Sequence, residues 1–264
     1  MNRTQITLFL VLAFVIALPI NLLAQKNDKN RSQDEHIYQI TDEVVVPHTS
    51  VKNQAQSGTC WCFAGVGMVE AEILRKYNVE IDLSEMYLVR WAYAQKFEKY
   101  IRMQGTCNFS PGGEVFDVLY AINNDGMMTE DAYNGLVLGE NRHQHGELHN
   151  VLAEYGKIIN RKHNGKISNV WSNMVQSILD VYLGETPETF DFKGITYNAL
   201  SLSEKYPLNI DDYVQISAFT NHENYKPYIM PIQDNWTNTQ SYNMSLDELM
   251  NELDNALNNG YTVG

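Results

Sequence analysis

Cys60 stands at a point in this chain where a thiol could act as a nucleophile. It follows a glycine-containing turn and precedes a run whose apolar spacing predicts a helix over Trp61–Tyr77. The unpaired N–H groups and the dipole at a helix N-terminus stabilise negative charge, so a thiol placed there is partly thiolate at neutral pH. We therefore predict that Cys60 is the attacking group of a covalent mechanism.

The same short segment offers donors for the oxyanion that such an attack creates. The backbone N–H of Cys60 points to where this charge would develop, and the side-chain amide of Gln54, six residues earlier, can supply a second donor. A lone cysteine in a helix is more often buried and inert. Here the spacing from Gln54 and the adjoining Trp61 favour the catalytic interpretation.

The other two cysteines, Cys62 and Cys107, have less specific surroundings. Cys62 lies two residues beyond Cys60 and so faces away, which predicts a small core residue. Cys107 could be a free thiol or a disulfide partner of Cys62. With three cysteines, at least one thiol stays unpaired within the chain.

Composition excludes one large class of partners. The formal net charge of -13 and the pI near 4.9 argue against nucleic-acid binding, which needs clustered Lys and Arg. Phosphate-binding loops and nucleotide fingerprints are absent, and we expect no cofactor. The 264 residues, 44% of them hydrophobic, can form one sizeable core or two smaller ones.

The N-terminal residues have the layout of a secretory signal. A short basic start leads into an apolar run that ends at Ala24, so residues 1–24 are predicted to be a signal peptide and residues 25–40 a polar, flexible leader. The mature protein would be exported to the periplasm or the extracellular space, with no stable membrane partner. The alternative is an uncleaved membrane anchor, against which Pro19 argues.

Helices dominate the first part of the remaining chain and strands the second, which indicates an α+β fold. Ser84 is the predicted N-cap of a second helix that starts in residues 83–85. A tight loop over residues 110–113 opens a third helix, and the polar, histidine-bearing residues 140–165 lead to a further one. That helix and the later elements are expected at residues 170–183, strands 213–219 and 228–232, helix 245–257 and a strand start at 261–263.

The segment resembles the active site of papain-like cysteine peptidases, in which residues like Gln54, Ser57, Gly58, Cys60, Trp61 and Phe63 have the same order and spacing. Ser57 stands where papain has a disulfide cysteine, so the segment more closely resembles the bleomycin hydrolase and aminopeptidase C branch. Residues 186–190 and 213–216 look like insertions of that branch. The resemblance implies a papain-like fold over residues 41–264, with a helical nucleophile-bearing domain followed by the start of a β-rich domain.

The resemblance also assigns roles to residues. Cys60 and Gln54 become catalytic, and Gly58, Trp61, Gly112 and Gly113 become substrate-binding, with Gly113 holding the main chain of an extended peptide. The family implies peptide substrates, aminopeptidase activity and a homo-oligomer, often a hexamer. Two alternatives stay open: an endopeptidase of the same fold, or a catalytically inactive scaffold that binds peptides.

The histidine that such a peptidase needs is not evident. Of the seven histidines, only His222 is at a plausible distance from Cys60 in sequence, and it lies in a polar stretch. The chain ends in an apparent strand at Gly264, so we expect the catalytic His and Asn beyond that residue. His143, His145 and His149 could ligate a metal, but a solvated loop is favoured because no further ligand completes a set, and no metal is predicted.

Overall fold

The computed structural model describes residues 44–137, 139, 141–161 and 166–264. The predicted signal peptide and leader lie outside these residues. Val44–Gly264 forms one compact unit. Within the described ranges, no helix has both the length and the apolar character needed to cross a membrane.

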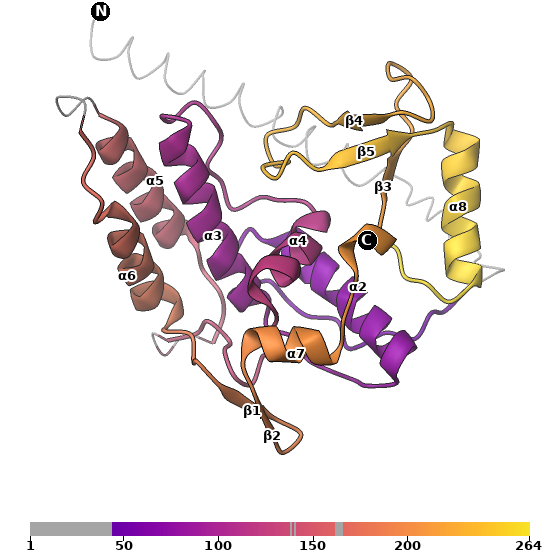
Figure 1. The fold of residues 1–264 in the computed structure, drawn as a ribbon, viewed down its shortest axis with the longest axis horizontal. Coiled ribbons are helices and arrows are strands. Elements are labelled where there is room, and N and C mark those ends of the chain that lie inside the picture. The colour runs from indigo at the N-terminus through magenta and orange to yellow at the C-terminus, as the bar shows by residue number, and fades with distance from the viewer. Residues whose placement is uncertain (1–43, 138, 140, 162–165) are drawn as a thin grey trace, which may run out of the picture. The chain divides into compact units, whose positions relative to one another are not determined.

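Five helices make up the first part of the unit, and the central one is α3 (Figure 1). It packs against α2 and α4 on one side and against α5 and α6 on the other. Phe97 of α3, fully buried, lies at the centre of this arrangement, where its ring stacks on Tyr155 and Trp171. The bounds of the helices are α2 Cys60–Tyr77, α3 Glu85–Arg102, α4 Phe116–Asp125, α5 Gly146–Asn160 and α6 Trp171–Leu183.

Helix α2 forms where the sequence predicts it and buries the expected stripe. Val66, Val69 and Ile73 are fully buried, at the three- and four-residue spacing of one helix face. Gly65 brings α2 close to α4, since a Cβ at this position would lie 2.6 Å from Val118 Cγ2. Helix α2 is therefore fixed along its length by apolar packing.

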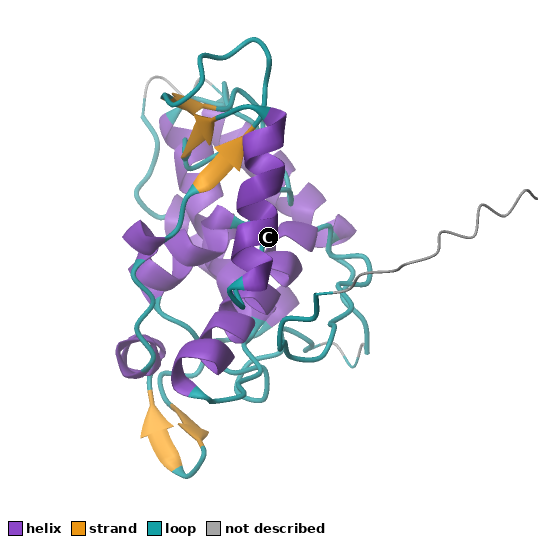
Figure 2. Cartoon of the chain, turned by 90° about the vertical axis from the view of Figure 1, so that its right-hand side faces the viewer, coloured by secondary structure: helices purple, strands orange, loops and turns teal. Residues whose placement is uncertain are grey.

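The second part of the unit contains the strands. β1 (Phe190–Phe192) and β2 (Ile195–Tyr197) form an antiparallel hairpin, followed by α7 (Ala199–Lys205) and a 3-10 turn at Ile210–Asp212. A separate sheet has the order β3–β5–β4, with β5 parallel to β3 and antiparallel to β4. The hairpin and this sheet lie at opposite ends of the helical part (Figure 1, Figure 2). The remaining bounds are β3 Gln215–Ser217, β4 Pro227–Ile229, β5 Gln240–Asn243 and α8 Leu246–Asn258.

The helical part followed by sheet elements confirms the predicted fold class. Ser84 caps α3 as expected, its hydroxyl accepting from Tyr87 N–H at 3.0 Å. Ser245 caps α8 through a capping box with Glu248.

Two sequence predictions about elements were wrong. The stretch expected as a polar lead-in over residues 140–165 contains α5, which forms because Leu148, Leu152 and Ile159 fall on one face and are buried. Residues 261–263 do not form a strand; in the described part of the chain no strand pairs with them. An apolar, β-branched run without a partner strand has no ladder to join.

Candidate active site

Cys60 is the first residue of α2 and its side chain is exposed. The preceding Thr59 makes no side-chain cap, and its carbonyl accepts from the N–H of Cys62 at 2.9 Å. Among the described residues nothing accepts from the N–H of Cys60, so this donor remains available at the helix N-terminus. An exposed thiol beside a free N–H is the arrangement that a nucleophile with an oxyanion donor requires.

The turn before the helix depends on Gly58. Its φ of +70° lies in the left-handed region that favours glycine, and a Cβ here would lie 3.3 Å from Pro111 Cβ. The turn is also closed by a 2.6 Å contact between the hydroxyls of Ser57 and Thr59, both buried. Ser57 thus takes part in a hydrogen bond at the position where papain has a disulfide cysteine.

Cys60 opens into a cavity of about 990 Å³. Its walls come from α2, α4, β3 and α8 and from residues 113–115, 212–214 and 261–264. Much of the lining is apolar, including Met68, Leu119 and Leu253. The charged side chains of the lining are all acidic: Glu114, Asp212 and Glu252.

Gly113 forms part of the wall next to Cys60. It packs closely on the ring of Trp61, since a Cβ on Gly113 would lie 2.9 Å from two indole atoms. The Trp61 indole N–H donates to the carbonyl of Pro111 at 2.9 Å. A Cβ on Gly112 would lie 2.5 to 2.6 Å from the Asp234 carboxyl. The structure therefore brings Gly58, Trp61, Gly112 and Gly113 together around the start of α2.

Gln54 lies in the turn that precedes this segment, where its carbonyl accepts from Ser57 N–H at 3.2 Å. Its side-chain Oε1 is buried without a hydrogen-bond partner. In the described part of the chain no residue accepts from its Nε2. The residue is not part of the cavity lining around Cys60, and its oxyanion role stays a prediction.

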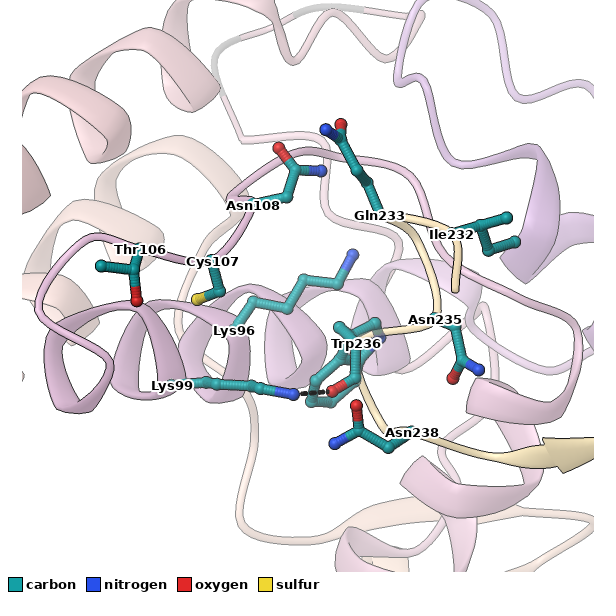
Figure 3. Close-up of a pocket in the computed structure, with 10 residues that line it drawn as sticks. All are labelled: Lys96, Lys99, Thr106, Cys107, Asn108, Ile232, Gln233, Asn235, Trp236 and Asn238. Carbon is teal, nitrogen blue, oxygen red and sulfur yellow. Dashed lines mark hydrogen bonds between the residues drawn. The ribbon is translucent and has the colours of Figure 1, made fainter. Parts of the chain in front are cut away.

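The prediction for Cys62 is confirmed. It is fully buried, and its thiol donates to the carbonyl of Glu85 at 3.4 Å. Burial raises its pKa well above the ordinary value, with Glu85 and Asp117 adding to the effect. Cys107 is half-buried and unbonded, so no disulfide joins it to Cys62. It lines a second cavity of about 460 Å³, between α3 and the segment that carries Trp236 (Figure 3).

None of the five described histidines lines the cavity that holds Cys60. His222 stacks on Tyr228 with ring centroids 3.9 Å apart, and its carbonyl accepts from Asn243 Nδ2 at 3.1 Å. His48 makes a 2.6 Å contact from Nδ1 to the carbonyl of Thr49. Of the other three described histidines, His143 and His145 lie just before α5, and His149 lies in its first turn. None of the five described histidines is therefore placed beside Cys60, where it could accept a proton from the thiol.

His143 and His145 lie in a loop that enters a helix, as the sequence favoured, but His145 is buried rather than solvated, and His149 belongs to the helix itself. His145 is 4% exposed, with its ring 6.2 Å from that of Tyr93, and burial lowers its pKa to about 4. His149 stacks on Phe109 at 5.7 Å. His145 precedes α5 directly and His149 is part of it, so both rings lie against the aromatic side chains of the helical part. Across the residues that the structure describes, no group of three or more His, Cys, Asp or Glu is placed to hold a metal ion.

Sequence reasoning missed two buried charges behind the Gly113 wall, Lys96 and Asp117. Lys96 is 5% exposed and Asp117 is fully buried. Each lies next to a fully buried apolar residue of its helix, Lys96 next to Phe97 in α3 and Asp117 next to Val118 in α4. An ionisable residue at a core position was the signal that could have found them.

Comparisons with known proteins identify the family. A family model described as papain family cysteine protease matches residues 39–240. Peptidase 1 of Psoroptes ovis is 36% identical over 85 residues, which are 32% of this chain and 22% of that protein. Cathepsin L2 of Homo sapiens is 32% identical over 92 residues, 35% of this chain and 25% of the relative. The alignment thus spans a quarter or less of the length of these curated relatives.

A solved structure shares the fold over nearly the whole chain. The crystal structure of PepW from Lactobacillus rhamnosis HN001 has a TM-score of 0.68 at 17% sequence identity, covering 99% of this chain and 69% of that one. The chain belongs to the papain family of cysteine proteases, with the mixed helix-and-sheet fold expected of it.

Proposed function

We propose that this chain carries the nucleophile and oxyanion side of a thiol peptidase, which hydrolyses peptide bonds through an acyl-enzyme on Cys60. The observation that carries the proposal is the exposed Cys60 at the start of α2, beside a wall formed by Gly113. The thiolate attacks the carbonyl carbon, and the N–H of Cys60 and the amide of Gln54 stabilise the resulting oxyanion. Expulsion of the amine leaves the acyl-enzyme, which water then hydrolyses.

We further propose that the histidine of this mechanism is not among the five described ones. The support is that none of them lines the cavity with Cys60, and that none has the sequence context of the family's catalytic histidine. The test is turnover of a fluorogenic aminoacyl amide by the 264-residue protein, by His222→Ala and by Cys60→Ala. We expect Cys60→Ala to abolish turnover and His222→Ala to leave it unchanged. Turnover that is lost in His222→Ala would overturn this part of the proposal.

Within the peptidase class we propose an aminopeptidase, as the resemblance to the bleomycin hydrolase branch implies. A specific observation supports it: Glu114, Asp212 and Glu252 line the cavity, and no basic side chain does. Carboxylates would attract the free ammonium group of a peptide.

The experiment compares two dipeptidyl vinyl sulfones that differ only in acetylation of the terminal amine. We expect the free-amine probe to modify Cys60 at least threefold faster. Equal or faster modification by the acetylated probe would favour the endopeptidase alternative. No adduct on Cys60 with either probe, while iodoacetamide still reacts there, would favour the inactive scaffold.

We also propose that the protein acts outside the cytoplasm, on the pattern of residues 1–24. N-terminal sequencing of the protein purified from its natural source tests this. A mature chain beginning at Gln25 is expected. An intact Met1 in a soluble cytoplasmic fraction would contradict export.

A further inference from the structure

Side chains of α2 and α3 hold the loop that carries Gly112 and Gly113 by donating hydrogen bonds to its carbonyl groups. Lys96 Nζ, reaching from α3, donates to the carbonyl of Gly112 and, at 3.3 Å, to that of Ser110. The carbonyl between them, that of Pro111, accepts from Trp61 at 2.9 Å. Three consecutive carbonyls are therefore bound from behind by side chains of α2 and α3.

Asp117 of α4 holds the other end of the same loop. Its Oδ2 accepts from the N–H of Glu114 at 2.9 Å and from the indole N–H of Trp236 at 2.7 Å. Its Oδ1 accepts from the hydroxyl of Thr237 at 3.0 Å. Because Asp117 is fully buried, each of these bonds offsets part of the cost of removing the carboxyl from water.

Charge and aromatic contacts support the same arrangement. Lys96 Nζ lies 5.5 Å from the ring centroid of Trp61 and 5.7 Å from that of Trp236, within cation–π range. Burial lowers the pKa of Lys96 to about 8, opposed by Asp117 and Asp234. The side chain thus remains largely an ammonium at pH 7, with three N–H donors for its acceptors.

Figure 3 shows Lys96 and Lys99 reaching from α3 toward the segment that carries Trp236, with Lys99 donating to the Trp236 carbonyl. Trp236 is therefore held at both its backbone and its indole N–H. The network joins α2, α3, α4 and the residues just before β5 behind the loop.

The main-chain N–H and carbonyl of Gly113 take no part in this network. Among the described residues, none hydrogen-bonds to its N–H or its carbonyl, although its neighbours Gly112 and Glu114 are both bound. Gly113 lines the cavity of Cys60. An extended peptide can pair with these two groups as one strand pairs with another.

We propose that Lys96 and Asp117 are positioning residues for substrate: they fix the loop over residues 110–114 so that the main chain of Gly113 faces a peptide lying beside Cys60. This rests on the proposed function, in which a peptide occupies that cavity. Neither residue touches the substrate; both act through the loop. A loop fixed in advance binds a peptide without the entropy cost of ordering it.

The test separates peptide positioning from thiol reactivity. Modification of Cys60 is measured at pH 7 with a free-amine dipeptidyl vinyl sulfone and with iodoacetamide, and the ratio of the two second-order rate constants is the readout. Lys96→Met removes the donors and keeps most of the side-chain length. Arg102→Met, on the exposed end of the same helix, is the matched control for the loss of one cation. Asp117→Asn weakens the other end of the network.

We expect Lys96→Met to lower the ratio at least tenfold, Asp117→Asn to lower it in the same direction, and Arg102→Met to leave it unchanged. The iodoacetamide rate should stay within about twofold in all variants, which shows that the start of α2 is intact.

If Lys96→Met folds and keeps the wild-type ratio, the inference is wrong. If the wild-type protein itself shows no preference for the peptide probe, it is the proposed function that fails. If Lys96→Met does not fold, Asp117→Asn decides: an unchanged ratio would overturn the inference.

Discussion

Cys60 and Cys62 are separated by one residue but differ in their exposure to solvent. Cys60 is exposed at the first position of α2, whereas Cys62 is fully buried and bonded to the backbone of α3. The difference follows from the helix itself, because residues i and i+2 point to different faces. The sequence was sufficient to predict both fates, since a helix start and its periodicity decide them.

The buried charges were harder to predict. Lys96 donates to the carbonyl of Gly112, and Asp117 accepts from the indole N–H of Trp236. Both partners lie outside the helix that carries the charged residue. The sequences of α3 and α4 alone therefore do not predict that these side chains will hydrogen-bond to a carbonyl or an indole N–H. The position of Gly113 in the same cavity as Cys60 could be expected from the sequence, while its role in binding substrate stays a prediction.

Glu85, another buried charge of α3, makes stability depend on pH. It is 4% exposed, and burial, aided by Glu130 and Glu70, raises its pKa to about 8. The folded state therefore holds this proton more tightly than the unfolded state. The free energy of unfolding falls as pH rises from the unfolded pKa through the folded one.

We expect Glu85→Gln to reduce the loss of stability between pH 6 and pH 9 by about 2 kcal/mol, because the amide has no proton to release. Urea unfolding at the two pH values measures it. Glu98→Gln, on the same helix but paired with Arg102 at the surface, is the control and should leave the pH dependence unchanged. A pH dependence that is unaltered in Glu85→Gln would contradict the burial argument.

At the scale of elements, α2 has two glycines with different surroundings. Gly65 faces α4, where a Cβ would lie 2.6 Å from Val118 Cγ2 and 3.0 Å from the carbonyl of Val115. Nothing lies within 4 Å of a Cβ built on Gly67. The close approach of α2 to α4 therefore depends on Gly65 and not on Gly67.

The same substitution should therefore have opposite effects at the two positions. Gly65→Ala is expected to lower the free energy of unfolding by about 1–3 kcal/mol, because α2 and α4 must separate. Gly67→Ala is expected to raise it by about 0.5–1 kcal/mol, because alanine loses less backbone entropy in a helix. Chemical denaturation of both variants measures the pair. Destabilisation of equal size at both positions would show that the contact with α4 is not the cause.

Helices and strands were predicted correctly where the residue pattern within the segment determines the structure. The prediction failed where the structure depends on pairing with another strand. The helices α2, α3 and α6 have uninterrupted periodicity and caps or turns that the sequence displays. β5 lies in a polar stretch and becomes a strand because β3 and β4 bracket it. Residues 261–263 have the composition of a strand, but no strand pairs with them in the described chain.

At the scale of the whole molecule, the cavity of Cys60 is assembled from both parts of the unit. α2 and α4 supply one side, while β3 and α8 supply the other. The protein carries a formal net charge of -13, and the charged side chains in the cavity lining share its sign. Such a field concentrates cationic ligands near the nucleophile.

Salt should therefore slow the reaction of a positively charged peptide. Between 20 mM and 500 mM NaCl, we expect modification of Cys60 by the free-amine vinyl sulfone to slow at least twofold, because the screening length shortens. Iodoacetamide is neutral and serves as the control, with a rate that does not change. A salt-independent rate for the cationic probe would show that the acidic lining plays no part in recognition.

The proposal that Cys60 is a nucleophile directed at peptides is tested by the site at which a peptidyl vinyl sulfone modifies the protein. Intact-mass and peptide mass spectrometry after limited reaction should find one adduct, on Cys60, with Cys62 unmodified until the protein is unfolded and Cys107 reacting more slowly. Cys60→Ala should abolish that adduct. Preferential modification of Cys107, or a Cys60 that reacts no faster with the peptide probe than a denatured control does, would contradict the account.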